Sequence, residues 1–451
     1  MSKTKAHVKS WPRLRSVRSA IGRLADEAVA SAEAIAEFAE PPMREFQSSD
    51  RLAGFLAGHG FRVTRPWRDL PTAFRAVAGT GGPTIAVLGE YDALPNCGPA
   101  PGAWGHGCGH NLLGAGAAAA GIVAAEALAR TKTPARIVVF GCPAEEALSG
   151  KVFMAARGAF RGLDAVLTWH PAGTNFANVA GGAAMDSVLF AFRGRTAHAA
   201  GGPEQGRSAL DAALLMDVAV NYLREHTAEN TRMHSVITDG GAAPNVVPDS
   251  AEIWYYLRGD DRKQVDALRH RVRLCARGAA MATETRSRMT VQTSIAERIP
   301  NRTMGDLLDT LLRRCGPPRF TPSDARAARR VLPGKAYANG VDAMRVKTGR
   351  GSSDEDNVSW FAPLGNIGVA CVPKNTPGHH RDYARAVRLS GAHRGMVKAA
   401  EVLAMAAIEL AVNAPLRRRA QAEQTKARKG KKYALPMRKG ARPPVFARPQ
   451  T

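Results

Sequence analysis

The chain has 451 residues, of which 45% are hydrophobic and 23% are charged, and its formal net charge is +24. These values exclude a largely disordered, collagenous or coiled-coil chain. The length exceeds what one compact core usually holds, so we expect two domains. Residues 1–23 contribute +7 and residues 416–451 contribute +11, which leaves +6 for the residues between them. We expect a basic N-terminal extension over 1–23 and, because apolar periodicity is lacking, a basic disordered tail over 417–451.

The cysteine usage and the hydropathy pattern indicate a cytoplasmic protein. Six cysteines are scattered along the chain without the paired spacing of a disulfide framework, which is typical of a reducing compartment. The basic N-terminus has no apolar segment of the kind found in secretory signals. The longest uncharged apolar stretch, residues 111–125, is too short to span a bilayer. We therefore expect no membrane segment.

The first elements in chain order are two helices, predicted over 21–38 and 50–59. Three short apolar runs then predict buried strands, at 84–88, 136–140 and 165–168. A helix of small residues is expected over 112–129, between the first two strands. Short buried strands that alternate with helices indicate an α/β fold, with a mostly parallel sheet flanked by helices. Polar residues follow each strand, at the carboxyl ends where such sheets bind ligands.

A different pattern begins near residue 184. Strands are expected at 187–193, 236–238 and 252–257, and helices at 208–225 and 261–281. The order strand–helix–strand–strand–helix–strand is that of a small α+β sandwich. We therefore place an inserted α+β domain at 184–298, between the two parts of a catalytic domain, 24–183 and 299–416. A long helix predicted over 390–416 ends the second part.

Four segments at predicted strand ends or in loops carry side chains that bind metals. They are Cys108 with His110 in a glycine-rich run, the neighbours Glu145 and Glu146, His170, and the pair His379 and His380. Each segment alone has an ordinary explanation, as a glycine-rich loop, a solvated acidic pair or a hydrogen-bonded histidine. Together they mix thiolate, imidazole and carboxylate, a set that suits zinc or another borderline divalent ion. Of two adjacent glutamates in extended backbone, one can bind a metal while the other takes a proton from bound water.

The motifs around these residues resemble those of the two-metal aminoacylase and carboxypeptidase family. The matching runs are LGEYDALP at 88–95, GCGHN at 107–111, PAEE at 143–146, HP at 170–171, PNVVP at 244–248 and SDEDNVSW at 353–360. The Cys-x-His form is similar to the amidohydrolase branch, which includes aminobenzoyl-glutamate hydrolases and Xaa-basic dipeptidases. The resemblance covers about residues 30–412. It departs from the family at residues 38–43, where relatives usually show a His-Pro-Glu run.

The resemblance implies a role for each candidate residue of the catalytic domain. Two divalent ions, zinc or manganese, would share Cys108, and their other ligands would be His110, Glu146, His170 and His379. Glu145 would be the general base that takes a proton from metal-bound water and later protonates the leaving amine. Asp92 would orient one of the ligands, as carboxylates beside metal sites commonly do. The spacing seen in relatives favours His379 over His380, and both remain candidates.

The inserted unit resembles the lid and dimerisation domain of the family. His198, which ends the run GRTAH at 194–198, would reach into the active site of a partner subunit and stabilise the oxyanion. Asn245 and Arg258 would hold the carboxylate of the substrate, for which the fork of an arginine is geometrically suited. The resemblance therefore implies a homodimer.

These observations predict a metal-dependent amidohydrolase that cleaves an amide bond beside a free carboxylate. The expected substrates are small molecules, namely N-acyl amino acids, aminobenzoyl-glutamate-like conjugates or dipeptides. Two alternatives remain open. The first is a dipeptidase of the same family that prefers a basic residue. The second is a family member without catalysis, which would bind RNA or another polyanion non-specifically through its basic ends, although all five candidate ligands are present.

Overall fold

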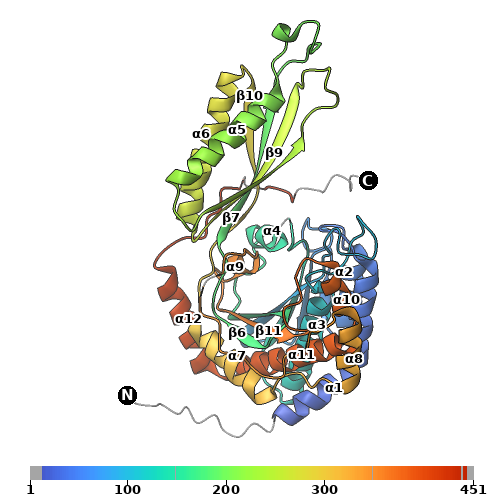
Figure 1. Cartoon of the computed structure of the whole chain (residues 1–451). Coiled ribbons are helices and arrows are strands. Elements are labelled where there is room, and N and C mark those ends of the chain that lie inside the picture. Colours follow the sequence, from blue (N-terminus) through green and yellow to red (C-terminus); the bar gives the residue numbers. More distant parts are fainter. Residues whose placement is uncertain (1–12, 148, 348, 438–439, 444–451) are drawn as a thin grey trace.

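The structure, a computed structural model, describes residues 13–147, 149–347, 349–437 and 440–443. Figure 1 shows a helix-flanked sheet with a slender α+β domain standing on it. The α/β fold class and the inserted α+β unit predicted from the sequence are confirmed. The strands of the inserted unit begin at Ala184 and end at Ile295.

The larger sheet has seven strands in the order β1-β2-β4-β3-β5-β11-β6. Its four central strands are parallel: β4 (Arg136–Cys142), β3 (Thr84–Glu90), β5 (Ala165–Ala172) and β11 (Leu364–Ala370). The outer strands pair antiparallel: β1 (Arg62–Thr64), β2 (Phe74–Ala78) and β6 (Phe176–Asn178). The carboxyl ends of the parallel strands therefore meet at one edge, below the inserted domain in Figure 1.

Helices cover both faces of this sheet. The larger core includes α1 (Arg13–Phe38), α2 (Phe46–Gly58), α3 (His110–Arg130), α7 (Arg302–Cys315) and α11 (Ser390–Val412). A second core on the other face includes α4 (Gly150–Ala156) and the end of α9 (Glu355–Val358). Two shorter helices, α8 (Pro322–Val331) and α10 (Arg381–Ala386), lie beside each other, and α8 also contacts α11.

Helix α3 is long and apolar enough to cross a membrane by length and composition. However, 78% of its apolar window is buried inside the protein, between the sheet and the helices α1 and α11. Its alanines and glycines allow this close packing. The apolar character of α3 is therefore that of a core helix.

The inserted domain has a four-stranded antiparallel sheet in the order β10-β7-β9-β8. Its strands are β7 (Ala184–Arg193), β8 (Arg232–Asp239), β9 (Ser250–Gly259) and β10 (Arg286–Ile295). The helices α5 (Ala209–Leu223) and α6 (Arg262–Ala282) cover one face, and two short 3₁₀ helices occupy Pro203–Gln205 and Arg224–His226. In β9 every second residue is buried, as expected for a strand with one face on a core.

The predicted N-terminal boundary is wrong. Helix α1 begins at Arg13, and its residues Val17 and Ile21 belong to the main core. Arg18 also donates from Nη2 to Glu401 of α11 at 2.8 Å. The basic residues of this segment lie on the exposed side of an amphipathic helix, so charge alone misplaced the boundary. Residues 1–12 of the predicted extension lie outside the described residues.

The predicted disordered tail is also wrong at residues 417–428, which are helical. A helix, α12 (Ala414–Arg428), begins directly after α11 and buries a stripe formed by Leu416, Ala420 and Gln424. Glu423 accepts hydrogen bonds from the backbone of α7 at Arg302 and Thr303. The stripe has an i, i+4 spacing but only one large apolar residue, which is why the sequence concealed it. Residues 444–451 lie outside the described residues.

Candidate metal centre

The site lies where the carboxyl ends of β3, β4, β5 and β11 meet. Glu90 ends β3 and pairs in register with Cys142, the last residue of β4. Glu145 and Glu146 follow β4 through a turn in which Ala144 has a positive φ of 59°. His170 lies on β5 opposite Gly368 of β11. The parallel sheet therefore brings residues from distant parts of the sequence to one edge.

Two glycines place Cys108 and His110 at this edge. Gly109 precedes α3 with a φ of 80°, a conformation that glycine adopts without steric cost. It lets the chain turn between the two ligands, so that His110 becomes the first residue of the helix. A Cβ at Gly114 would lie 2.6 Å from the carbonyl oxygen of Glu90. The absence of that atom lets α3 pack directly against the end of β3.

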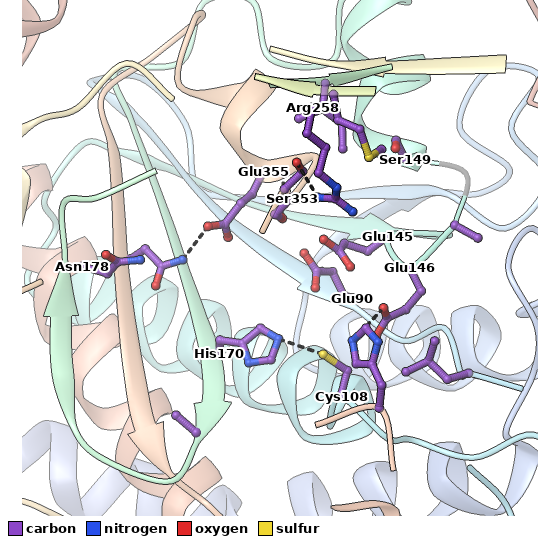
Figure 2. Close-up of a pocket in the computed structure, with 18 of the residues that line it drawn as sticks. Glu90, Cys108, Glu145, Glu146, Ser149, His170, Asn178, Arg258, Ser353 and Glu355 are labelled. Carbon is purple, nitrogen blue, oxygen red and sulfur yellow. Dashed lines mark hydrogen bonds and ion pairs between the residues drawn. The ribbon is translucent and has the colours of Figure 1, made fainter. Parts of the chain in front are cut away.

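The five predicted metal ligands lie together, and Figure 2 shows three of them, Cys108, Glu146 and His170. They form two sets that share Cys108: one with His110 and His170, the other with Glu146 and His379. Within each set the ligand atoms lie within 4.8 Å of one another. Cys108 Sγ is 3.3 Å from His170 Nε2, and Glu146 Oε2 is 3.4 Å from His379 Nε2. This arrangement would allow two neighbouring metal ions to share the sulfur of Cys108.

The donor atoms of this cluster fit a pair of divalent ions. His110 Nδ1 donates to Asp92 at 2.9 Å and His170 Nδ1 donates to the Pro171 carbonyl at 2.7 Å. Each ring therefore has its Nε2 lone pair directed into the cluster, as metal-binding histidines commonly do. Glu146 Oε1 is buried and has no hydrogen-bond partner among the described residues, which a cation would satisfy.

The structure separates the two neighbouring histidines. The backbone of His379 donates to Gly107 at 2.9 Å, and its ring lies beside Glu146. His380 instead caps α10, because its Nδ1 accepts a hydrogen bond from the backbone of Asp382. His379 is therefore the one that joins the ligand cluster.

A cleft of about 610 Å³ opens above the ligands, between the two domains. The catalytic domain lines it with the ligand cluster and with Phe176, Asn178 and Arg345. The inserted domain contributes Met185, Tyr256 and Arg258. The volume is in the range of small-molecule sites.

Residues 180–283 match the family model of a peptidase dimerisation domain. A p-aminobenzoyl-glutamate hydrolase component from Escherichia coli (strain K12) is 33% identical, over 91% of this chain and 95% of that protein. The chain belongs to the M20 peptidase family. It is thus a metal-dependent hydrolase of amide or peptide bonds, as the motifs predicted.

Other relatives agree with this family. The Xaa-Arg dipeptidase of Mus musculus is 32% identical, over 77% of this chain and 76% of its own. The structure of an aminobenzoyl-glutamate utilization protein from Klebsiella pneumoniae superposes with a TM-score of 0.62 at 21% identity, covering 88% of this chain and 98% of that one. A dinuclear metal-binding M20 peptidase from Bacillus subtilis superposes with a TM-score of 0.56 at 17% identity, covering 86% and 99%. These two likenesses concern the fold.

Burial dominates the electrostatics of this M20 site. Burial raises the pKa of Glu145 well above its usual value, and the nearby carboxylates of Glu90 and Glu146 raise it further. Burial likewise raises the pKa of the Cys108 thiol, with a contribution from Glu146. Burial acts against ionisation of Asp92 too, but the charge of His110 and its hydrogen bond lower the pKa of that carboxyl. A bound cation would oppose the effect on Cys108, because metal-bound thiols are deprotonated.

Of the residues of the inserted domain that were predicted to contact the substrate, one lies in the cleft and two lie outside it. Arg258 lines the cleft and donates from Nη1 to Ser352 Oγ at 2.8 Å (Figure 2). His198 and Asn245 are exposed and are not among the residues that line it. The two lie on neighbouring segments, because the backbone of Ala199 donates to Asn245 at 3.0 Å. This single chain therefore brings Arg258 to the site but leaves the other two outside it.

Sequence reasoning missed three charged residues of the site: Glu90, Lys151 and Asp354. Lys151 is fully buried, and its ammonium lies 2.6 Å from both Glu90 Oε1 and Asp354 Oδ1. Glu90 and Asp354 both stood in matching motifs, at 88–95 and 353–360, but no role was assigned to them there. Lys151 and Asp354 are 203 residues apart, so their pairing depends on the tertiary fold.

Proposed function

We propose that this protein hydrolyses the amide bond of an N-acyl amino acid in which the amino-acid part carries a second carboxylate, as in an aminobenzoyl-glutamate-like conjugate. The observation that carries this choice is a pair of arginines in the cleft, Arg258 and Arg345. Neither guanidinium forms an ion pair with a carboxylate among the described residues. Two unpaired cations in one cleft are suited to a substrate with two negative groups.

The two arginines are held in place by neutral partners. Arg258 donates to Ser352, and burial lowers its pKa. The guanidinium carbon of Arg345 lies 3.4 Å from the centre of the Phe176 ring, a cation–π contact. Burial also lowers the pKa of Arg345, and Asp342 opposes this in part. A substrate carboxylate would supply the charged partner that both groups lack.

The carboxylates of the cleft do not favour the alternative function, a dipeptidase that prefers a basic residue. Glu355 is the cleft carboxylate outside the ligand cluster, and it is already paired with Arg298 and accepts from Asn366 at 2.7 Å. The others, Glu90, Glu145 and Glu146, belong to the cluster. A basic side chain of a dipeptide would thus find no unengaged carboxylate among the described residues of the cleft.

The proposed reaction assigns one task to each group. Two divalent ions, zinc or manganese, would be held by Cys108, His110, Glu146, His170 and His379, and would lower the pKa of a bound water and polarise the amide carbonyl. Glu145 accepts the proton of that water and passes it to the leaving amine, a task for which a raised pKa is favourable. Arg258 orients the carboxylate next to the scissile bond.

We propose that a second copy of this chain supplies His198 and Asn245, for oxyanion stabilisation and carboxylate binding. The inserted domain has the exposed apolar surface that this requires. On α5, Leu214, Val218 and Tyr222 are 47%, 51% and 77% exposed, and on the edge strand β8 Val236 is 53% exposed. Patches of this kind mark protein interfaces. A homodimer is therefore part of the proposal.

The cytoplasmic location predicted from the sequence is also kept as a proposal, supported by six cysteines that are all free. Non-specific contact of the basic ends with polyanions is a separate proposal that does not involve the cleft. Arg418 and Arg419 on α12 are exposed and available for such contact.

A substrate series tests the proposed preference. Three amides that share one acyl group and end in glutamate, glutamine or arginine are compared by kcat/KM. We expect the glutamate amide to be preferred at least about 10-fold over the glutamine amide, because one charged hydrogen-bonded pair is lost. Arg345→Met should bring this ratio close to one while the glutamine amide is cleaved as before. Preference for the arginine amide would instead establish the basic dipeptidase.

Glu145→Gln tests the general base in the same preparation. The variant should lose hydrolysis of every substrate while its metal content, measured by elemental analysis, stays that of the unmodified protein. Retained turnover would show that another group accepts the proton.

A further inference from the structure

The wall of the ligand cluster contains a lysine that holds two carboxylates. Lys151 is fully buried, and its Nζ lies 2.6 Å from Glu90 Oε1 and 2.6 Å from Asp354 Oδ1. The backbone of Lys151 also donates to Asp354 Oδ2 at 2.8 Å. A buried ammonium is costly unless it is paired on all sides. This arrangement fixes the carboxylate of Glu90 and commits one of its oxygens to Lys151.

The other oxygen of Glu90 faces the ligand cluster. Glu90 Oε2 lies 3.2 Å from His110 Nε2. That nitrogen is the one left for a metal, because His110 Nδ1 is bonded to Asp92. Glu90, His110 and Glu145 also form a set whose ligand atoms lie within 4.8 Å of one another. Glu90 is thus directed at the space where an ion on His110 would lie.

The separation of these two atoms fits two ligands of one ion. Nitrogen and oxygen ligands lie about 2.0–2.2 Å from zinc, so at angles between roughly 90° and 110° they are about 2.8–3.6 Å apart. The 3.2 Å between Glu90 Oε2 and His110 Nε2 falls within this range. The same holds for the 3.4 Å between Glu146 Oε2 and His379 Nε2. By the distance between ligand atoms, Glu90 is as suitably placed to bind an ion as the predicted ligand Glu146 is.

We propose that Glu90 is a sixth metal ligand, which binds through Oε2 the ion held by His110. Lys151 and Asp354 act as positioning residues, because they orient Glu90 and keep its binding to a single oxygen. A second negative ligand besides the thiolate balances the charge of this ion. The inference rests on the proposed function only in requiring that an ion occupies the cluster.

Metal binding to the full-length chain tests this assignment. The protein is freed of metal and titrated with Co²⁺ in the absence of oxygen, while calorimetry measures affinities and absorption reports the thiolate–cobalt and ligand-field bands. The unmodified protein should bind two Co²⁺. Glu90→Gln should weaken one of them at least about 10-fold, as lost metal-site contacts do, and should change its ligand-field bands while the thiolate band remains.

Two further variants complete the design. Lys151→Met should weaken the same ion by a smaller factor, since Glu90 stays present but loses its orientation. Glu40→Gln, which alters a buried carboxylate outside the cluster, should leave both affinities and spectra unchanged. If Glu90→Gln does not fold, judged by circular dichroism, Glu90→Asp takes its place, because the shorter carboxylate should also weaken one ion.

The outcomes separate the ligand assignment from the proposed function. Two ions bound with unchanged affinities and spectra in the Glu90 variants would overturn the ligand role and leave Glu90 as a partner of Lys151 alone, with the proposed function intact. An unmodified protein that binds no Co²⁺ would overturn both.

Discussion

The turn that carries Glu145 depends on a buried carboxylate from another part of the chain. Glu45 is fully buried and accepts hydrogen bonds from the backbone of Ala144 at 2.8 Å, the backbone of Met43 at 2.9 Å and the hydroxyl of Thr72 at 2.7 Å. Ala144 has a positive φ and directly precedes Glu145. We therefore predict that Glu45→Ala destabilises the protein and also displaces Glu145, the proposed general base.

The structure sets the size of the effect. The substitution leaves two buried N–H groups without an acceptor, at about 1–3 kcal/mol each. Removal of the buried carboxyl group itself offsets part of this loss of stability, because burial raises the pKa of Glu45 and so opposes its charge. We expect the free energy of unfolding to fall by roughly 2–4 kcal/mol. Since a misplacement of about 1 Å can cost on the order of 100-fold in rate, kcat should fall about 10- to 100-fold.

Glu40→Ala is the matched control. Glu40 is also buried and accepts from the backbone of Gln47 and Ser48 at the start of α2, but it does not contact the turn. Equilibrium unfolding in urea should show comparable losses for both variants, while kcat, measured on folded, metal-loaded protein, should fall for Glu45→Ala alone. Equal kcat in the two variants, or a loss of stability below about 1 kcal/mol for Glu45→Ala, would refute the reasoning.

Three further predictions follow from the site, the C-terminal helix and the proposed dimer. His379→Ala should lose affinity for one ion in a calorimetric titration, whereas His380→Ala should retain both ions and lose only about 1 kcal/mol of stability with its helix cap. A chain that ends at Asn413 should melt several degrees lower, in contrast to what the sequence predicted for a disordered tail, because α12 caps α7 and buries part of its surface. Val218→Glu should convert the dimer to a monomer in sedimentation experiments and lower kcat, while Phe46→Glu, at an equally exposed position on the catalytic domain, should change neither.

A strand could be predicted from the sequence where its buried positions carry apolar side chains. The run TIAVL predicted β3 because four of its five residues are apolar, and the structure buries all five. β11, with the sequence LGNIGVA, is buried at every position too, yet it was missed. Its glycines are required by packing, since a Cβ at Gly368 would lie 2.3 Å from the ring of Phe176 and one at Gly365 would lie 2.7 Å from Leu308. Where neighbours fill the space of a side chain, a glycine is required, and it weakens the hydrophobic signal of the strand.

The site shows the same division between local and tertiary information. Cys108 and His110 could be singled out because they lie in a short glycine-rich motif, and Glu146 because it follows a predicted strand. The pairing of Lys151 with Asp354 joins positions 203 residues apart, and no local pattern predicts it. The region of Glu40 and Glu45 lacks the His-Pro-Glu run of relatives, and its two glutamates nevertheless support α2 and the turn before Glu145.

The net charge of +24 says little about the cleft, because negative and positive side chains lie in different parts of it. At the ligand cluster, Lys151 is paired with Glu90 and Asp354, and it compensates for only part of the negative charge of the carboxylates there; divalent cations would supply the rest. Elsewhere in the cleft, Arg258 and Arg345 have neutral partners (Figure 2 shows Arg258). An N-acyl amino acid with two carboxylates therefore has one favourable orientation, with its acidic part on the arginines and its amide carbonyl over the metal ligands. The same polarity disfavours a reversed substrate, whose carboxylates would face Glu145 and Glu146.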